Sequence, residues 1–432
     1  IGHPELLDTL VRADLALTTK GRVELERDLA ALFRQAENLE ERLDVLRRFR
    51  NDEFLRIGVH DIAGELHYSE VSAQLTALAE VSLTGAYEVA LEERRARYGA
   101  ARGLELAVIA MGKLGGGELN YHSDLDLIFV YGPGTTPLGE LVPADTDSGE
   151  GRSEEPASTP QEPRAESDGT SGGAAGGLAP QEFFSKVAQL MMLVLQLSTR
   201  EGYVYKIDTR LRPSGRSGPL VASLDGFARY HARSSAVWER QALVRARVVA
   251  GPEGLRRAVD GVIERFVYGR GLEPHELAEI AHLRERMERE LAREDERHFN
   301  LKTGRGGLVD IEFIAQALAL EHGHAEPSLR ERSTRRLLDA LGACGLLGAS
   351  DHATLTQAYS FLRGLENRLR IEGDQPIERV PRDPSALASA ARRMGYREAA
   401  PAAAERMLGD YERHREAVRE VYRRVVGRHG EA

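Results

Sequence analysis

The chain has 432 residues, of which 42% are hydrophobic and 29% charged, and its formal net charge at pH 7 is −10. This length allows two or three domains, and the acidic balance argues against a general nucleic-acid binder, which would carry a basic excess. The single cysteine, Cys344, excludes an internal disulfide and fits a reducing, cytoplasmic location. No apolar run is long enough to cross a membrane, so no membrane partner is expected.

The predicted elements divide the chain into three blocks. In residues 1–100, leucines recur at three- and four-residue steps, which predicts amphipathic helices. Residues 101–250 hold short apolar runs that predict strands, together with the motifs described below. Residues 251–432 again show helical periodicity, enough for a helical bundle packed on the middle block. The expected fold class is therefore α+β.

A low-complexity stretch, Pro133–Pro180, interrupts the middle block. It is rich in Gly, Ser, Pro and Glu and has almost no large apolar residues. Such a composition cannot bury a core, so we expect this stretch to be disordered. An insertion of this kind is tolerated between strands where it leaves from a surface loop. We interpret it as a spacer without a function of its own.

The most informative motif covers residues 112–131 and reads GKLGGGELNYHSDLDLIFVY. Asp124 and Asp126 stand at the head of an apolar run that predicts a strand, and residues two apart on a strand point to the same face. Upstream, the flexible loop Gly112–Gly117 could bring backbone N–H groups to phosphate oxygens. Either feature alone is common, but paired carboxylates beside such a loop suit metal-assisted nucleotidyl transfer.

A third carboxylate, Asp208, ends the run Tyr203–Asp208, whose alternation predicts another strand. With the first two carboxylates it could hold two Mg²⁺ ions, because Mg²⁺ prefers oxygen ligands and usually keeps several waters. Arg210 and Arg212 follow on the same expected strand face, where their guanidinium groups suit the charge of a triphosphate. The alternative is that these arginines are only solvated or ion-paired, with Asp208 as their salt-bridge partner.

Several long stretches carry a resemblance to a known family. They are the glycine motif and the segments YKIDTRLRPSGRSGPLV (205–221), WERQALVRARVV (238–249) and FNLKTGRGGLVDIEFIAQ (299–316). They resemble the bacterial glutamine synthetase adenylyltransferase/adenylyl-removing enzymes of the DNA-polymerase-β-like nucleotidyltransferase superfamily. The resemblance implies a polymerase-β-like catalytic domain with a small mixed sheet in residues 101–250, flanked by the helical lead-in and the C-terminal bundle.

The family's full-length enzyme carries two similar units, one attaching AMP to glutamine synthetase and one removing it. This chain has one motif set and begins at Ile1, so we expect one half of such an enzyme. Its motifs resemble the C-terminal, adenylylating half more closely. Phosphorolytic removal of AMP, with ADP as the product, is the alternative. A non-catalytic docking module is a second alternative, against which the intact set of three aspartates argues.

The resemblance also implies substrates, regulators and site residues. Mg-ATP is expected to bind with its phosphates over Gly115–Gly117, and a tyrosine hydroxyl of glutamine synthetase to attack the α-phosphate, which metals on the three aspartates align. Lys113, Ser123, Arg210 and Arg212 are the further candidates for binding the nucleotide. PII-type signalling proteins and glutamine are the regulators that the family implies.

A further cluster lies in the helical block. Gly306–Gly307 precede Asp310, and Lys302 and Arg305 lie just upstream. In one interpretation the glycines form the turn into a helix, with Asp310 favoured in its first turn by the helix dipole. In the other, the loop faces the active site and brings Lys302 and Arg305 near phosphate or the target protein. Trp238, at the start of another predicted helix, is expected in the core.

Overall fold

The computed structural model describes residues 19–101, 103–134, 178–373, 376–399 and 401–427. The lead-in block consists of three helices, α2 (Arg22–Phe33), α3 (Leu39–Ala63) and α4 (Tyr68–Tyr98). The Asn38 side chain caps α3 by accepting from the Glu41 N–H, and Gly64 ends this helix in the left-handed conformation that glycine adopts easily. The helices expected in this block are confirmed for its described residues.

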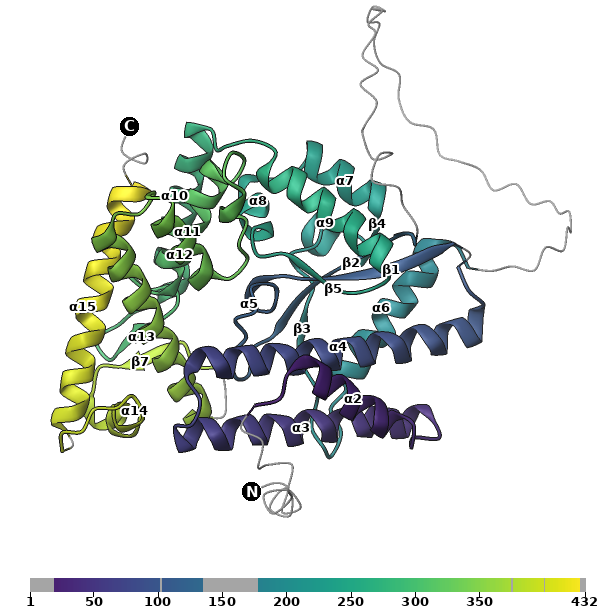
Figure 1. The fold of residues 1–432 in the computed structure, drawn as a ribbon, viewed down its shortest axis with the longest axis horizontal. Coiled ribbons are helices and arrows are strands. Elements are labelled where there is room, and N and C mark those ends of the chain that lie inside the picture. Colours follow the sequence, from purple (N-terminus) through teal and green to yellow (C-terminus); the bar gives the residue numbers. More distant parts are fainter. Residues whose placement is uncertain (1–18, 102, 135–177, 374–375, 400, 428–432) are drawn as a thin grey trace, which may run out of the picture.

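A five-stranded sheet forms the centre of the molecule (Figure 1). Its strands follow the order β3-β2-β1-β5, and β4 also pairs with β2. The strands are β1 (Leu104–Ala110), β2 (Leu125–Pro133), β3 (Ile207–Asp208), β4 (Val221–Ser223) and β5 (Arg247–Ala250). β1 runs antiparallel to β2 and β5, whereas β3 and β4 run parallel to β2. The small mixed sheet among helices confirms the α+β class.

Side chains of the sheet alternate between two apolar cores, as the period of two along a strand requires. Leu106 and Val108 of β1 belong to the core shared with α4 and α6 (Pro180–Gln196). Ala107 and Ile109 belong to the core on the opposite face, with α7 (Leu224–Arg233) and α9 (Glu253–Tyr268). Figure 1 shows the sheet between these two layers, with α3 and α4 on one side and α7 and α9 on the other.

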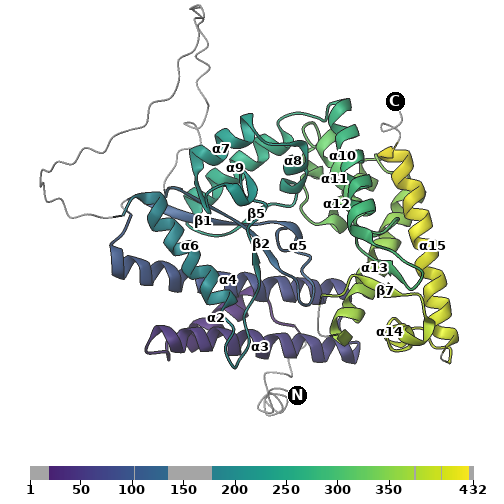
Figure 2. The ribbon, with the colours of Figure 1, turned by 180° about the vertical axis from the view of Figure 1, so that it is seen from behind.

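The C-terminal block is a helical bundle beside the sheet domain, seen from behind in Figure 2. It contains α10 (Pro274–Met287), α11 (Leu308–His322), α12 (Thr334–Ala343), α13 (Ala349–Gly373), α14 (Ala388–Arg393), α15 (Ala402–Val425) and the strand pair β6 (His298–Asn300) and β7 (Arg379–Pro381). α9, which the sequence suggested as part of this bundle, instead contacts β1, β2 and β5. Two further short helices, α5 (Gly112–Gly115) and α8 (Val237–Leu243), connect elements of the sheet domain.

Three expectations about local structure need correction or lie outside the structure. The strand expected over Tyr203–Asp208 is only two residues long, because the N–H groups of Val204 and Tyr205 donate to the Leu195 carbonyl and not to a neighbouring strand. Trp238 is 39% exposed and is not a core residue. Most of Pro133–Pro180 lies outside the described residues. Within the described ranges, no helix has the length and apolar character that a bilayer span requires.

Candidate active site

Two of the three candidate carboxylates lie side by side at the edge of the sheet. Asp126 of β2 and Asp208 of β3 are register partners in a parallel strand pair. Asp124 lies directly before β2 and is exposed. Further along β2, the face that carries Asp126 carries Ile128 and Val130 into the core beneath α7 and α9. The carboxylates therefore lie just beyond the part of this sheet face that α7 and α9 cover.

The neighbouring carboxylates influence each other's ionisation. Burial, followed by the negative charge of Asp208, raises the pKa of Asp126 to about 6, and Asp124 adds to the same effect. Lys302 and Arg210 act in the opposite direction on Asp126. Burial also acts to raise the pKa of Asp208, but hydrogen bonds from Arg210 outweigh it, so this pKa is lowered. The nearby cations thus balance the negative charge of these neighbouring carboxylates only in part, and Asp126 experiences the remainder.

This donor set fits a divalent cation in kind. Aspartate oxygens are the ligands that Mg²⁺ prefers, and a bound cation would relieve the repulsion that raises the Asp126 pKa. Among the described residues, however, no three His, Cys, Asp or Glu side chains converge as a closed metal site. The Arg210 side chain holds one of the carboxylates, since its Nε donates to Asp208 Oδ2 at 2.6 Å. A metal at this edge would compete with that guanidinium.

The structure corrects the expected placement of Arg210 and Arg212. β3 ends at Asp208, so neither arginine lies on a strand; the proline and glycines that follow favour a turn instead. The Arg212 guanidinium donates to the carbonyl oxygens of Thr209 at 2.8 Å and of Gly218 at 3.3 Å, which closes this loop upon itself. Arg210 is exposed and bound to Asp208, so it is the arginine that lies beside the carboxylates.

The glycine that lies against Asp126 is Gly112, the first residue of the loop and not one of the three glycines expected to bind phosphate. It has a φ of +54°, and a Cβ built at this position would lie 2.6 Å from Asp126 Oδ2. The Met111 N–H also donates to the Asp126 carbonyl at 2.9 Å, which ties the start of the loop to β2. Both the backbone conformation and the space beside Asp126 therefore require glycine here. Its position directly after a predicted strand was the available signal.

Gly115, Gly116 and Gly117 face away from this contact. A Cβ at Gly115 would collide with the backbone carbonyls of Arg245 and Ala110, and one at Gly116 with the Arg245 guanidinium. Their N–H groups donate to the carbonyls of Met111, Gly112 and Leu114, so the turn itself uses them. Close packing therefore explains glycine at Gly115 and Gly116, and the φ of +70° explains it at Gly117, where a Cβ would meet nothing within 4 Å. A phosphate site over these glycines stays a prediction that this geometry does not support.

Lys113 and Ser123 are held by the bundle. Lys113 Nζ lies 2.5 Å from Glu366 Oε1 on α13. Burial lowers the pKa of Lys113 to about 7 against the attraction of Glu366, whose own pKa lies well below its usual value because of Lys113 and nearby arginines. Ser123 Oγ accepts from the Asn120 N–H at 3.3 Å and from Arg370 at 3.4 Å. Both residues thus lie where α13 meets the motif.

A buried ion network behind the glycine loop was not anticipated. Arg245 bonds to Glu118 at 2.6 Å and to Glu312 of α11 at 3.0 Å. Arg363 of α13 lies 3.8 Å from both of these carboxylates and 2.9 Å from Glu366. Charged residues spaced along helices are usually solvated, so the sequence pattern gave no sign that these would be buried. The network joins the motif to two helices of the bundle.

The cluster near α11 divides between the two interpretations. α11 begins at Leu308 after Gly307, with Asp310 in its first turn, as the first interpretation expected. Asp310 is also fully buried against Arg284, which that interpretation did not include. Arg305 pairs with Glu416 at 3.6 Å. Lys302, however, lies close enough to Asp126 to lower its pKa, while its Nζ is 3.3 Å from Glu378. Lys302 is therefore the residue of this cluster that reaches the carboxylates.

Comparison with known families gives this site its context. The family model for glutamate-ammonia ligase adenylyltransferase matches residues 1–142 and 164–261, which is more than half of the chain. The chain belongs to this family. A second model, GlnD PII-uridylyltransferase, matches residues 281–426, which include the bundle helices α11 to α15. The adenylyltransferase match covers all three candidate carboxylates.

Curated relatives of this adenylyltransferase family agree with the match. The bifunctional glutamine synthetase adenylyltransferase/adenylyl-removing enzyme of Burkholderia pseudomallei (strain K96243) is 35% identical over 365 residues, covering 81% of this chain and 36% of the relative. The enzyme of the same name from Nitrosococcus oceani is 35% identical over 384 residues, covering 86% of this chain and 36% of the relative. The chain thus spans about a third of the length of these relatives.

Proposed function

We propose that this chain transfers AMP from ATP to a tyrosine hydroxyl of glutamine synthetase and releases pyrophosphate. The observation that carries the proposal is the pairing of Asp126 with Asp208 beside Gly112. Paired carboxylates next to a close backbone turn suit an in-line displacement at phosphorus. The relatives, whose printed name includes glutamine synthetase adenylyltransferase, support the choice of substrate.

The roles of the residues follow from their positions. Asp124, Asp126 and Asp208 would hold Mg²⁺, which when bound neutralises charge on the phosphate oxygens and on the leaving group. The charges of Lys302 and Arg210 act on Asp126, and they also suit the triphosphate. Arg210 would exchange its bond to Asp208 for the nucleotide. Catalysis then depends on positioning and electrostatics, and no covalent enzyme intermediate is needed.

Lys113 has a different part in this proposal. Its Nζ is held by Glu366, and burial brings its pKa to about 7. A lysine so placed fixes the first turn after Gly112 against α13, and from there it can approach a phosphate only if the ion pair with Glu366 opens. We therefore assign Lys113 mainly to positioning the loop. Ser123, whose Oγ accepts from the Asn120 N–H, would position Asp124 in the same way.

The direction of the reaction rests on resemblance. The segments 238–249 and 307–313 resemble the adenylylating half of the family's enzymes more than the removing half. The same carboxylates could serve phosphorolysis, and the printed name of the relatives includes both activities. We also propose a cytoplasmic location, with PII-type proteins and glutamine as regulators. The match of residues 281–426 to a PII-uridylyltransferase model supports a link to PII.

The experiment that tests this proposal supplies both possible substrates separately. Purified chain is incubated with unmodified glutamine synthetase and Mg-ATP labelled at the α-phosphate, and in parallel with AMP-modified glutamine synthetase, Mg²⁺ and phosphate. Label on the unmodified enzyme, with release of pyrophosphate, is the expected result. ADP formed only from the modified enzyme would reverse the direction and keep the same catalytic residues. No reaction in either assay would contradict a catalytic function for this chain.

A further inference from the structure

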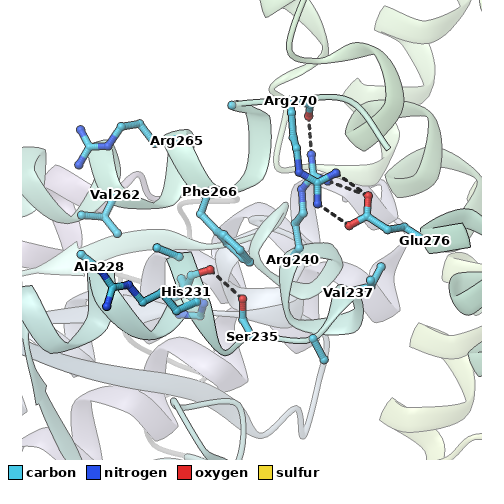
Figure 3. Close-up of a pocket in the computed structure, with 14 residues that line it drawn as sticks. Ala228, His231, Ser235, Val237, Arg240, Val262, Arg265, Phe266, Arg270 and Glu276 are labelled. Atoms are coloured by element: carbon cyan, nitrogen blue, oxygen red, sulfur yellow. Dashed lines mark hydrogen bonds and ion pairs between the residues drawn. The ribbon is translucent and has the colours of Figure 1, made fainter. Parts of the chain in front are cut away.

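A pocket lies between α7, α8, α9 and the start of α10. Its volume is about 500 Å³, within the range of pockets that bind small molecules. Figure 3 shows residues from all four helices around it, including His231, Phe266, Arg265 and Glu276. None of the candidate catalytic or nucleotide-binding residues lines it. The pocket is therefore separate from the carboxylate edge of the sheet.

His231 is the buried polar group of this pocket whose side chain has no hydrogen-bond partner among the described residues. Its side chain is 4% exposed, and its ring packs against Phe227 and Phe266, with ring centroids 4.5 and 4.9 Å apart. Both ring nitrogens are buried, and neither has a hydrogen-bond partner within the described part of the chain. Burial lowers the pKa of His231 to about 4, so the ring is neutral at pH 7. A neutral imidazole offers one donor and one acceptor, and here both are unused.

Buried polar groups in folded proteins nearly always have a partner, so an imidazole with two unused nitrogens needs an explanation. The only hydrogen bond drawn to this residue in Figure 3 uses its backbone carbonyl, which accepts from Ser235 Oγ at 2.9 Å. The remaining wall near the ring is apolar and consists mainly of Ala228, Val262 and Phe266. A ligand with an apolar body and one hydrogen-bonding group would match this wall and satisfy the ring.

The rim of the pocket is cationic. Arg240 and Arg270 also line it, but both are committed, Arg270 to Glu276 at 2.6 Å and Arg240 to backbone carbonyls such as that of Val267 at 3.1 Å. Arg233 and Arg265 are exposed, and over the described ranges neither makes an ion pair or side-chain hydrogen bond. The pocket thus combines a buried imidazole and apolar side chains with two exposed arginines, Arg233 and Arg265, that have no acidic partner among the described residues.

We propose that this pocket binds a small organic anion, whose apolar body packs on Phe266, whose hydrogen-bonding group meets His231 and whose charge meets Arg233 and Arg265. This binding site goes beyond the proposed AMP transfer and does not depend on it. An exposed guanidinium without an acidic partner favours a carboxylate or phosphate group over a neutral ligand. A ligand that reaches the buried His231 ring is favoured over one that contacts only the exposed arginines.

Benzoate is a suitable probe, because it joins an apolar ring to a carboxylate. Its binding to the full chain is measured by calorimetry, with ring-¹⁵N-labelled histidine observed by NMR, and benzyl alcohol and inorganic phosphate serve as the neutral and the charge-only ligands. We expect saturable benzoate binding that shifts the His231 ring signals. Arg265→Gln should weaken binding about tenfold, as loss of one charged contact would. Arg257→Gln is the matched control, since Arg257 lies on the same helix and is paired with Glu253.

His231→Phe keeps an aromatic ring against Phe227 and Phe266 and removes both ring nitrogens. The variant should therefore fold normally but bind benzoate more weakly. Benzoate binding that His231→Phe and Arg265→Gln leave unchanged would overturn the proposal. Equal affinity for phosphate and benzoate would also overturn it, because it would show a rim site for charge alone. Absence of saturable benzoate binding to the folded chain would mean that water satisfies His231 and would equally contradict the proposal.

Discussion

Asp126 and Asp208 lie opposite each other on β2 and β3, as the last of only two register pairs in that parallel ladder. β3 ends at Asp208, so the strand serves chiefly to bring this carboxylate beside Asp126. Burial and this neighbour raise the pKa of Asp126 to about 6. Carboxylates held so close together are costly unless a cation joins them. The pair is therefore the centre of the proposed catalytic site.

Gly112→Ala should reduce AMP transfer strongly. A Cβ at this position would lie 2.6 Å from Asp126 Oδ2, so the carboxylate has to move, and the φ of +54° adds strain. We expect a stability loss of about 1–2 kcal/mol from the left-handed conformation and a much larger proportional loss of activity. Transfer of labelled AMP and urea unfolding are measured on the same preparation.

The control for this variant is Gly345→Ala. Gly345 has a comparable φ of +72°, but a Cβ there would meet nothing within 4 Å. It lies after α12, outside the candidate site. Both variants should lose similar stability, and only Gly112→Ala should lose activity. Equal activities of the two variants would show that the contact between Gly112 and Asp126 has no importance for the reaction.

Arg245→Met should destabilise the protein by about 3–5 kcal/mol, because removing one member of a buried ion pair leaves uncompensated charge. Glu118 and Glu312 both lose their closest arginine in this variant. Arg257→Met removes an ion pair whose side chains are 65% and 76% exposed, so it should cost less than about 1 kcal/mol. Urea unfolding followed by circular dichroism compares them. A similar small loss in both would mean that the network does not hold the bundle to the glycine loop.

His231 should make stability depend on pH. Its pKa is 6.5 in the unfolded chain and about 4 in the folded one, because burial disfavours the charged ring. Between these values the unfolded state binds more protons, so this stability is complete above pH 6.5 and is lost as the pH falls towards 4. The loss is on the order of 3 kcal/mol relative to His231→Phe. Unfolding free energies of both proteins across this range are the measurement; parallel curves would contradict the assignment.

Replacing residues 135–177 by a short Gly/Ser linker should leave folding and chemistry unchanged. Changing the length of a flexible connection alters its closure entropy slowly, by roughly 0.6 kcal/mol per doubling. The segment connects β2, which ends at Pro133, with α6, which begins at Pro180. The melting temperature should stay within a few degrees of the original. A large fall would show that the segment packs against the domain.

The sequence predicted what depends on local periodicity and on nearby motif residues. The helical blocks and the strand after Asp124 could be expected, because apolar periodicity encodes them. The grouping of Asp126 with Asp208 was expected from the shared chemistry of the carboxylates and not from a local pattern. The short β3 and the folded-back Arg212 could not, since the proline and glycines after Asp208 allow several turns. Alternation along a strand gives no information on where the strand stops.

Apart from the grouping of the carboxylates, the sequence did not predict which distant segments contact each other. Lys113 of the glycine loop and Glu366 of α13 form an ion pair, and no pattern in either segment indicates the other. The role of Gly112 likewise depends on where Asp126 points. Buried charges such as Arg245 look like ordinary solvated residues in a sequence and are recognised only when their partners are in place.

The most direct test of the central claim is AMP transfer by Asp126→Asn. Asparagine keeps the size of the side chain but cannot carry the charge that faces Asp208, so the fold should remain, and stability should be equal or slightly higher once the repulsion is gone. Labelled AMP on glutamine synthetase is measured with Mg-ATP for the variant and the unaltered chain. We expect the folded variant to transfer almost no AMP. Transfer at a rate near that of the unaltered chain would contradict the central claim.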